Sequence, residues 1–445
     1  MAGSGQGHMI ATRRMVVFTG AWLGVTAGAA RAATKADHLA GLVPNSPRDQ
    51  TVALQGAIDD AAARGVALEL PAGVYQTGAL ALREASVVLG AGGLTRLAFT
   101  GSGAFITAQG ARGIRLAGLT LDGGMRPVTT ALLAMDGCTD LDMRALTVTS
   151  SSRDGVALTK CTGTVSACTV SQIANAGLFA LDSTLTLAGN TVSSCGNNGI
   201  LVWRSAVAED GSQVLNNRIE QIRADNGGSG QNGNGINVFR AGSVQVNGNR
   251  ITQCAYSAIR GNAASDIAIT GNHCQRIGEV ALYAEYGFSG ALIANNIVDG
   301  AACGISVTNF NEGGRLAVVQ GNLIRNLSRR EQEPQDKRGE GIAVEADTLV
   351  TGNTIENAPT CGILIGWGRH MRDVSATGNL IRGCKAGILI SSDAGAGAAL
   401  VAQNLISGAS EGAIRAHVTG RAFGPDLAKG PATTGRVTIS GNVVS

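Results

Sequence analysis

Apolar residues recur in short alternating units along most of the chain. The clearest unit is a glycine, an aliphatic residue, any residue and a second aliphatic residue. It occurs as Gly199-Ile200-x-Val202, Gly235-Ile236-x-Val238, Gly304-Ile305-x-Val307, Gly362-Ile363-x-Ile365 and Gly387-Ile388-x-Ile390. Alternation with a period of two predicts a β-strand whose Ile and Val point inward while the residue between them points outward.

A corner dipeptide precedes this strand by eight to nine residues in most units. The dipeptides are Gly189-Asn190, Asn216-Asn217, Gly248-Asn249, Gly271-Asn272, Asn295-Asn296, Gly321-Asn322, Gly352-Asn353, Gly378-Asn379, Gln403-Asn404 and Gly441-Asn442. Successive corners are 23 to 38 residues apart, which indicates a basic coil with insertions placed in loops. Weaker copies at Leu119, Leu146 and Cys168 extend the register towards the amino end and bring the corners to thirteen.

A coil of this length cannot bury its own apolar face, so it must stack on its neighbours. The repeat therefore predicts an all-β chain that forms a single-domain right-handed parallel β-helix of about a dozen coils. With about 4.8 Å between stacked strands, thirteen coils make a rod on the order of 60 Å long. We expect the corner asparagines to be structural, because Asn tolerates left-handed backbone angles and stacked Asn side chains bond along the axis.

A helix is expected before the first coil. Ser46 is its predicted N-cap and Pro47 its first residue, and Gly65 is its predicted C-terminal cap. Apolar residues at helical spacing lie between them at Leu54, Ala57, Ile58, Ala61 and Ala62. We expect this helix to cover the open end of the solenoid, so the chain divides into residues 1–33, 34–66 (linker and capping helix) and 67–445 (β-helix).

Residues 1–33 have the features of an export signal. Thr12-Arg13-Arg14 is followed by a mildly apolar stretch from Met15 to Ala30 and by Ala30-Arg31-Ala32 as a small-x-small cleavage site, with Met9 as a second candidate start. The paired arginines favour the twin-arginine export machinery as a transient partner, while ordinary unfolded export is the alternative. This pattern predicts a periplasmic or secreted protein.

The charge balance argues against two classes of partner. The chain has 35 basic and 32 acidic residues, so removal of the three arginines in residues 1–33 leaves 32 of each. A neutral chain has no net field that attracts nucleic acid or an anionic membrane. No later stretch reaches the roughly 18 apolar residues of a membrane helix, so membrane insertion is not expected.

The cysteines and histidines do not predict a metal or cofactor. Cys195, Cys254 and Cys384 each lie five residues after their corner, where other coils have Ile, Leu or Ala, so we expect buried thiols. A disulfide between Cys161 and Cys168 is an open alternative. The histidines that follow residue 33 are His38, His273, His370 and His417, with no two at metal-ligand spacing.

Aromatic residues gather on one predicted strand. The chain has fifteen aromatics, of which Phe18 and Trp22 precede the cleavage site, leaving thirteen. Seven of these lie on or just beyond the Gly-Ile-x-Val strand: Trp203, Phe239, Tyr283, Tyr286, Phe288, Phe310 and Trp367. The insertions 223–234 and 328–340 precede this strand and are expected to wall a groove over it.

Outward columns read from the register supply the candidate substrate-binding residues. These are Trp203, Arg204, Asn237, Phe239, Arg240, Asn262, Tyr286, Asn309 and Trp367. Aromatic faces stack on sugar rings, amides bond hydroxyls, and arginines bind carboxylates, so this mixture favours a polysaccharide or oligosaccharide. The alternative is an ordinary solvated outer face.

Four residues are candidates for catalysis: Arg260, Tyr283, Glu285 and Glu345. Glu285 and Glu345 lie in one column two coils apart, about 9.6 Å, near the upper end of the carboxylate separation used by inverting glycoside hydrolases. The alternative is β-elimination from a uronic acid, in which Arg260 or Arg240 neutralises the carboxylate and Tyr283 or an arginine handles the proton.

The entry to the first coil resembles that of pectate-lyase-type β-helix proteins. The matching residues are Asp49-x-Thr51, Leu54-Gln55-x-Ala57-Ile58 and Leu70-Pro71-Ala72-Gly73-Val74-Tyr75. The whole chain after the signal resembles the right-handed β-helix superfamily, which includes polysaccharide lyases, polygalacturonase-like hydrolases and mannuronan epimerases. The Arg-Arg signal with Gly-Asn repeats is similar to a twin-arginine-translocated β-helix repeat family, which implies export and the fold but no reaction.

The chain departs from the enzymes of that superfamily. It lacks the adjacent Asp pair of polygalacturonases, the Asp-Pro-His motif of mannuronan epimerases and the acidic cluster of calcium-dependent pectate lyases. The leading hypothesis is therefore an exported carbohydrate-active protein that binds, and in one version cleaves, a polysaccharide on the outer strand face. The alternative is a non-catalytic glycan-binding or cell-envelope structural β-helix protein.

Overall fold

The computed structural model describes residues 41–445 except 229, 309–314, 331–338 and 431–432. Residues 1–37 and 38–445 form two separate units. The predicted export signal lies outside the described residues, so the fold below is that of the second unit.

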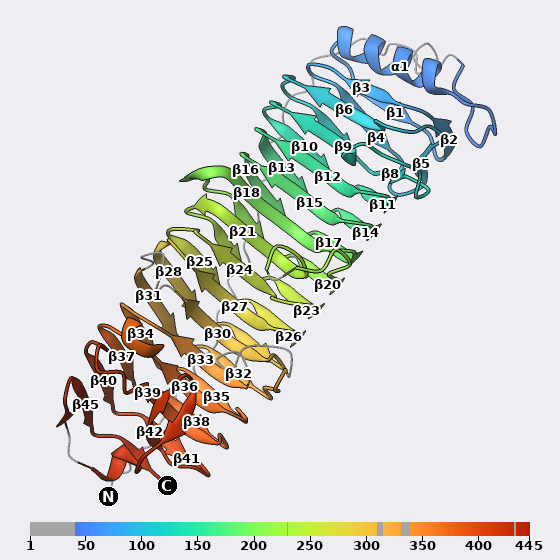
Figure 1. Ribbon diagram of the computed structural model, residues 1–445. Coiled ribbons are helices and arrows are strands. Elements are labelled where there is room, and N and C mark those ends of the chain that lie inside the picture. The colour runs from blue at the N-terminus through green and yellow to red at the C-terminus, as the bar shows by residue number, and fades with distance from the viewer. Residues whose placement is uncertain (1–40, 229, 309–314, 331–338, 431–432) are drawn as a thin grey trace, which may run out of the picture. The chain divides into compact units, whose positions relative to one another are not determined.

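Three parallel β-sheets form the walls of a solenoid (Figure 1). Sheet A runs from β1 (Leu68–Leu70) to β45 (Val437–Ser440), and the last strand, β44 (Thr433–Thr434), pairs antiparallel with β45. Sheet B runs from β2 (Gly73–Thr77) to β46 (Val443–Val444). The chain visits sheets A, B and C in turn, and each strand pairs with the equivalent strands of the coils before and after it. The predicted right-handed parallel β-helix is confirmed.

Sheet C carries the Gly-Ile-x-Val strands. Its members are β3 (Leu80–Leu82), β6 (Ile106–Gln109), β9 (Ala131–Asp136), β12 (Asp154–Thr159), β15 (Ala176–Leu181), β18 (Asn198–Glu209), β21 (Asn234–Gly242), β24 (Ile259–Asn262), β27 (Val280–Glu285), β30 (Cys303–Thr308), β33 (Glu340–Val344), β36 (Cys361–Ile365), β39 (Ala386–Ser391), β42 (Ile414–Val418) and β43 (Arg421–Phe423). The last of these pairs antiparallel with β42. Strand β18 is twelve residues long, and its residues 204–207 bulge out, a segment that we call the β18 flap, before Ala208 and Glu209 pair again with Ala241 and Gly242 of β21.

The helix α1 (Thr51–Ala63) lies at the start of the solenoid, as expected (Figure 1). Its apolar stripe is buried at Leu54, Ala57, Ile58 and Ala61, and Ala62 is half-buried. The predicted N-cap Ser46 is wrong, because the helix begins at Thr51, four residues after the predicted first residue Pro47, with Gln50 as N-cap. Asp49 Oδ1 accepts a hydrogen bond from the Thr51 backbone N–H at 2.9 Å, and that bond fixes the first turn.

The turn between sheets A and B has a constant length over most of the solenoid. From β10 (Leu141–Arg144) onward, two residues separate each sheet A strand from its sheet B strand. The first of the two is left-handed, for example Gly189 (φ 64°), Asn216 (φ 54°) and Asn295 (φ 57°). The left-handed angle therefore belongs to the residue before the ladder asparagine, and not to that asparagine as the sequence suggested. Glycine is frequent here because it adopts this angle without a steric penalty.

The second turn residue forms a continuous ladder of buried asparagines. Its members are Asn190, Asn217, Asn249, Asn272, Asn296, Asn322, Asn353, Asn379, Asn404 and the half-buried Asn442. Each side-chain Nδ2 donates to the Oδ1 of the next asparagine at 2.9–3.0 Å. That Oδ1 also accepts the donor residue's backbone N–H, as from Asn296 to Asn322 at 2.9 Å, while Asn296 Nδ2 donates to the Ile269 carbonyl of the preceding coil. One amide thus links three coils, and the structural role predicted for these asparagines is confirmed.

The core lies inside the solenoid and is aliphatic. Ile200, Val202, Ile236 and Val238 of the Gly-Ile-x-Val strands are fully buried, as predicted. The glycine that opens this strand is needed for close approach: a Cβ on Gly235 would lie 2.6 Å from the Ile251 side chain and 2.7 Å from the Ala258 carbonyl oxygen.

All nine cysteines are buried with free thiols, including the predicted inward column of Cys195, Cys254 and Cys384. The alternative disulfide between Cys161 and Cys168 does not form, and burial raises the pKa of each of these thiols to about 11.

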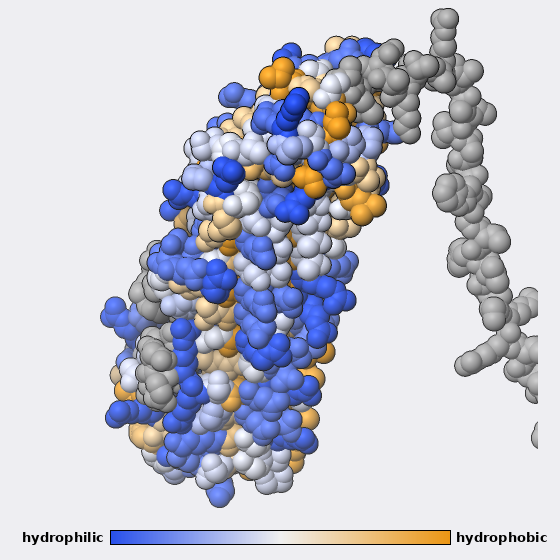
Figure 2. Space-filling model, turned by 90° about the vertical axis from the view of Figure 1, so that its right-hand side faces the viewer, coloured by the Kyte–Doolittle hydropathy of each residue, from blue (hydrophilic) through white to orange (hydrophobic). Residues whose placement is uncertain are grey.

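The outer surface reflects the stacking of coils. On the face shown in Figure 2, hydrophilic and apolar residues form rows along the long axis, because equivalent positions of successive coils lie in columns. The described part of the chain has no helix long and apolar enough to cross a membrane.

Candidate functional site

The outward columns predicted on sheet C pair in the expected register. The first column runs through Leu201, Asn237, Arg260, Tyr283, Ser306, Ala343, Leu364, Leu389 and Arg415. The second runs through Trp203, Phe239, Asn262, Glu285 and Thr308. The register predicted from the spacing of the corners is therefore correct on the face where the candidate residues lie.

A cleft of about 390 Å³ opens over β18, β21, β24 and β27. Its lining consists of Trp203, Gly230, Gln231, Asn237, Phe239, Arg260, Asn262, Glu285 and Tyr286. Seven of these nine residues are ones that the sequence nominated. We call this hollow the sheet C cleft.

One wall of the sheet C cleft is aromatic. The Trp203 ring meets the Phe239 ring edge-on, with centroids 5.6 Å apart, and it meets Phe179 in the same manner at 5.4 Å. These three residues come from three adjacent strands, β15, β18 and β21, so stacking of the coils creates the row. The indole Nε1 of Trp203 is buried and donates no hydrogen bond to the described residues.

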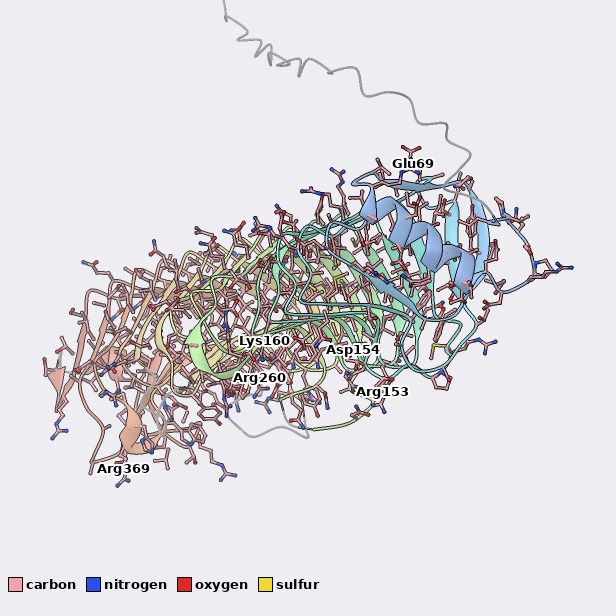
Figure 3. All side chains as sticks on the ribbon, turned by 90° about the horizontal axis from the view of Figure 1, so that it is seen from above. Glu69, Arg153, Asp154, Lys160, Arg260 and Arg369 are labelled. Atoms are coloured by element: carbon pink, nitrogen blue, oxygen red, sulfur yellow. The ribbon has the colours of Figure 1, made fainter. Side chains whose placement is uncertain are left out.

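The floor of the cleft is a buried ion cluster around Arg260. Its Nε and Nη2 donate to the two carboxylate oxygens of Glu285 at 2.6 and 2.8 Å, and Asn262 Nδ2 donates to Glu285 Oε1 at 2.8 Å. Arg260 Nη1 lies 3.5 Å from Glu279 Oε2, and the guanidinium stacks on the Tyr283 ring at 4.9 Å from its centroid. In Figure 3, Arg260 lies on the side of the solenoid away from Glu69 of β1.

Burial and charge act in opposite directions on Arg260. Desolvation would lower the pKa of its guanidinium, but the carboxylates of Glu285 and Glu279 outweigh it and raise that pKa, so Arg260 stays cationic. Its Nη1 makes no hydrogen bond within the described residues, and neither does the buried Oδ1 of Asn234 nearby in β21. Both atoms are buried, so the hydrogen-bonding groups that the cleft offers to a ligand include the side-chain amides of Gln231, Asn237 and Asn262 in its lining.

The insertion 223–234 walls the cleft, as predicted. The Gly230 carbonyl accepts hydrogen bonds from Asn234 Nδ2 at 2.9 Å and from Asn237 Nδ2 at 3.4 Å. A Cβ on Gly230 would come within 2.6 Å of Arg260 Nη2, so only glycine lets the loop lie this close to the guanidinium. Of the second insertion, residues 328–330, 339 and 340 are described: Arg330 donates to the Gly278 carbonyl at 2.9 Å, and residues 331–338 lie outside the described residues.

Two arginines nominated for substrate binding lie outside the cleft lining. Arg204 Nε donates to the buried carboxylate of Asp210 at 2.7 Å, which anchors the base of the β18 flap. Arg240 stacks over Phe239 at 4.6 Å from the ring centroid and donates to the Ser205 carbonyl at 2.9 Å. Both arginines therefore hold the flap against the sheet.

Three further candidates, Tyr283, Glu345 and Trp367, are also outside the cleft lining. Tyr283 is 1% exposed beneath Arg260. Glu345 is buried directly after β33, and Trp367 lines a separate shallow hollow with Val418, Arg421 and Phe423. Asn309 lies outside the described residues.

The geometry of Glu285 bears on the catalytic hypothesis. Glu345 follows Val344, which pairs with Val307, so two coils separate the two carboxylates, as the register predicted. Both oxygens of Glu285 already accept hydrogen bonds and its side chain is 1% exposed, so proton transfer to a substrate would require breaking the Arg260 ion pair. Within the described residues, no group of three His, Cys, Asp or Glu side chains is placed to hold a metal ion.

Sequence reasoning missed part of the site. Phe179 stands one coil before the first column residue that was considered, and extending the register to Leu178-Phe179-Ala180 would have found it. Glu279 precedes its strand and so belongs to no outward column. Gly230 and Gln231 reach the cleft from a loop, whose path the sequence pattern does not determine.

Comparison with known families agrees with the fold. A family model described as "Right handed beta helix region" matches residues 154–324 and, in an overlapping match, 206–373. None of the curated proteins is significantly similar to the chain in sequence.

Solved structures with the same fold are distant in sequence. The N-terminal fragment of gene product 12 of bacteriophage phi29 is similar with a TM-score of 0.64 and 15% identity, over 86% of this chain and 72% of that one. A lacto-N-biosidase from Eubacterium ramulus is similar with a TM-score of 0.50 and 13% identity, over 75% of this chain and 62% of that one. The A-module of a mannuronan C-5 epimerase from Azotobacter vinelandii has a TM-score of 0.46 and 17% identity, over 91% of this chain and 97% of that one. At these identities the likeness to the first two structures is evidence of the fold alone.

Proposed function

We propose that this protein is an exported carbohydrate-active protein that binds a polysaccharide in the sheet C cleft. The observation that carries the proposal is the row of Phe179, Trp203 and Phe239 beside the side-chain amides of Gln231, Asn237 and Asn262 in the cleft lining. Aromatic faces bind the apolar C–H faces of sugar rings, while directional donors and acceptors bind hydroxyls. Export rests on the sequence pattern of residues 1–33.

The charges of the cleft favour an uncharged glycan. Arg260 and Glu285 are the charged members of the described lining, and they neutralise each other at hydrogen-bond distance. Glu279 also lies beside Arg260, so the cluster contains one positive side chain and two negative ones. A sugar carboxylate entering the cleft would meet no uncommitted cation among the described lining residues, so a polyuronate is disfavoured.

Tryptophan fluorescence reports binding at this one place. The chain has three tryptophans, Trp22, Trp203 and Trp367. In a background with Trp22→Phe, the variant Trp367→Phe leaves Trp203 in the cleft as the sole reporter, and Trp203→Phe leaves Trp367 as its matched control. Both are titrated with neutral cello-, malto- and N-acetylchito-oligosaccharides and with acidic oligogalacturonate and oligomannuronate.

We expect at least one neutral series to change the Trp203 signal and to leave the Trp367 signal unchanged. Trp203→Ala should weaken binding measured by calorimetry about 10-fold or more, because loss of a central aromatic contact costs about 2 kcal/mol. No response to any neutral glycan, or a response confined to Trp367, would refute the proposal. Reducing ends and unsaturated-sugar absorbance measured on the same mixtures decide between binding alone and cleavage.

A further inference from the structure

A second hollow lies on sheet C closer to α1. It has a volume of about 650 Å³ and opens over β3, β6, β9 and β12. Its outward lining includes Ala81, Thr107, Gln109, Ala134, Asp136 and Thr159. We call it the amino-terminal hollow. Its floor is flat because the outward residues of the first column are small there.

The amino-terminal hollow and the sheet C cleft lie on the same two columns. Ala81, Thr107, Ala134, Ala157 and Phe179 pair in order and continue into Leu201. Gln109, Asp136, Thr159 and Leu181 pair in order and continue into Trp203. The two hollows therefore form one strip from β3 to β27, and its eight stacking steps span roughly 38 Å at about 4.8 Å each.

On the carboxyl side of the sheet C cleft, the outward positions of the first column are buried. Beyond Arg260, the outward residues Tyr283, Ala343, Leu364 and Leu389 are 1–8% exposed and form a second apolar cluster outside the solenoid core. Trp367 and Ala422 pack against this cluster. Other side chains of the chain thus cover these outward positions next to the cleft, and a separate hollow of about 400 Å³ lies further along, at Lys385, Leu389 and Arg421.

We infer that a bound glycan longer than the cleft extends towards α1, and that its further sugar units occupy the amino-terminal hollow. This inference rests on the proposed function. The alanines offer flat contact for sugar rings, and the hydroxyls of Thr107 and Thr159 with the side chains of Gln109 and Asp136 offer partners for sugar hydroxyls. Continuity of the two columns with the aromatic row identifies the occupant as the same glycan strand.

The test fills the hollow and leaves the cleft intact. Ala134→Trp places an indole on the outward face of β9, and Thr107→Trp on β6 is a second variant. The matched control is Ala268→Trp, a half-buried outward alanine in β25 (Ile267–Thr270) of sheet A. Affinities are measured for oligosaccharides of two to six units from the neutral series that binds most tightly, after thermal unfolding shows each variant to be folded.

We expect the affinity of the unmodified protein to rise with chain length, by about 10-fold or more between two and six units. In Ala134→Trp and Thr107→Trp this gain should disappear while affinity for the shortest oligosaccharide and the behaviour of Ala268→Trp are unchanged. Equal affinity for short and long chains, or a length gain that survives both substitutions, would overturn this inference and leave the proposed function intact. Failure of every oligosaccharide to bind would overturn both.

Discussion

The asparagine ladder makes a quantitative prediction at Asn296, in the middle of the solenoid. Its Oδ1 accepts from the backbone N–H and from Nδ2 of Asn272 at 2.9 and 3.0 Å. Its Nδ2 donates to the carbonyl of Ile269 and to Oδ1 of Asn322, both at 2.9 Å. Asn296→Ala removes these four buried bonds at once. Each contributes about 0.5–1.5 kcal/mol net, so we expect the free energy of unfolding to fall by roughly 4 kcal/mol.

The matched control is Asn295→Gly, one residue earlier. Asn295 is exposed and left-handed, and other coils already have glycine at this position, so the change should stay within about 0.5 kcal/mol. Guanidinium unfolding followed by circular dichroism gives the midpoint and slope for both variants, and hydrogen exchange over residues 269–300 locates the loss. If Asn296→Ala cost less than about 1 kcal/mol, or no more than Asn295→Gly, the ladder would not be a main source of stability.

Three further predictions concern buried groups. Glu285→Gln leaves Arg260 without its bidentate partner and should lower the free energy of unfolding by about 3–5 kcal/mol in chemical denaturation, whereas Asp225→Asn, at an exposed ion pair, should cost less than about 1 kcal/mol. Burial lowers the pKa of His417 to about 4, below its ordinary 6.5, so the stability it contributes is complete above pH 6.5 and is lost as the pH falls towards 4. The free energy of unfolding should therefore fall by about 3 kcal/mol over this pH range, and this loss should disappear in His417→Asn. An unchanged dependence of stability on pH in the variant would show that His417 does not titrate this way. Gly235→Ala should cost about 1–3 kcal/mol in thermal unfolding because its Cβ meets the next coil, and a neutral result would contradict that contact.

Much of the site could be predicted from the repeat, because residues at equivalent positions of successive coils stack in columns. Once the corner asparagines were aligned, Asn237, Arg260 and Tyr283 had to lie side by side on successive strands, and they do. The same alignment correctly turned Cys195 and Cys254 into the core.

What the pattern could not supply was burial on the outer face. A column position is exposed only where no loop covers it, and loop paths are not encoded in the strand period. Arg260 and Glu285 were therefore interpreted as exposed catalytic groups, whereas the structure pairs them beneath Gly230. The prediction of the helix start failed although Ser46 has the side chain of an N-cap, because the chain forms turns and bends up to Gln50 and becomes helical only at Thr51.

The fixed two-residue turn has a consequence for how this protein can vary. A coil that must bring its asparagine into contact with the next one cannot gain or lose a residue between sheets A and B, because one added residue would shift the amide out of reach. Length changes are thus tolerated at the other two turns, and both of these border sheet C. The insertion 223–234 and the β18 flap are examples. From β10 onward, changes in loop length therefore fall next to sheet C, so selection can reshape ligand specificity while the asparagine ladder is kept.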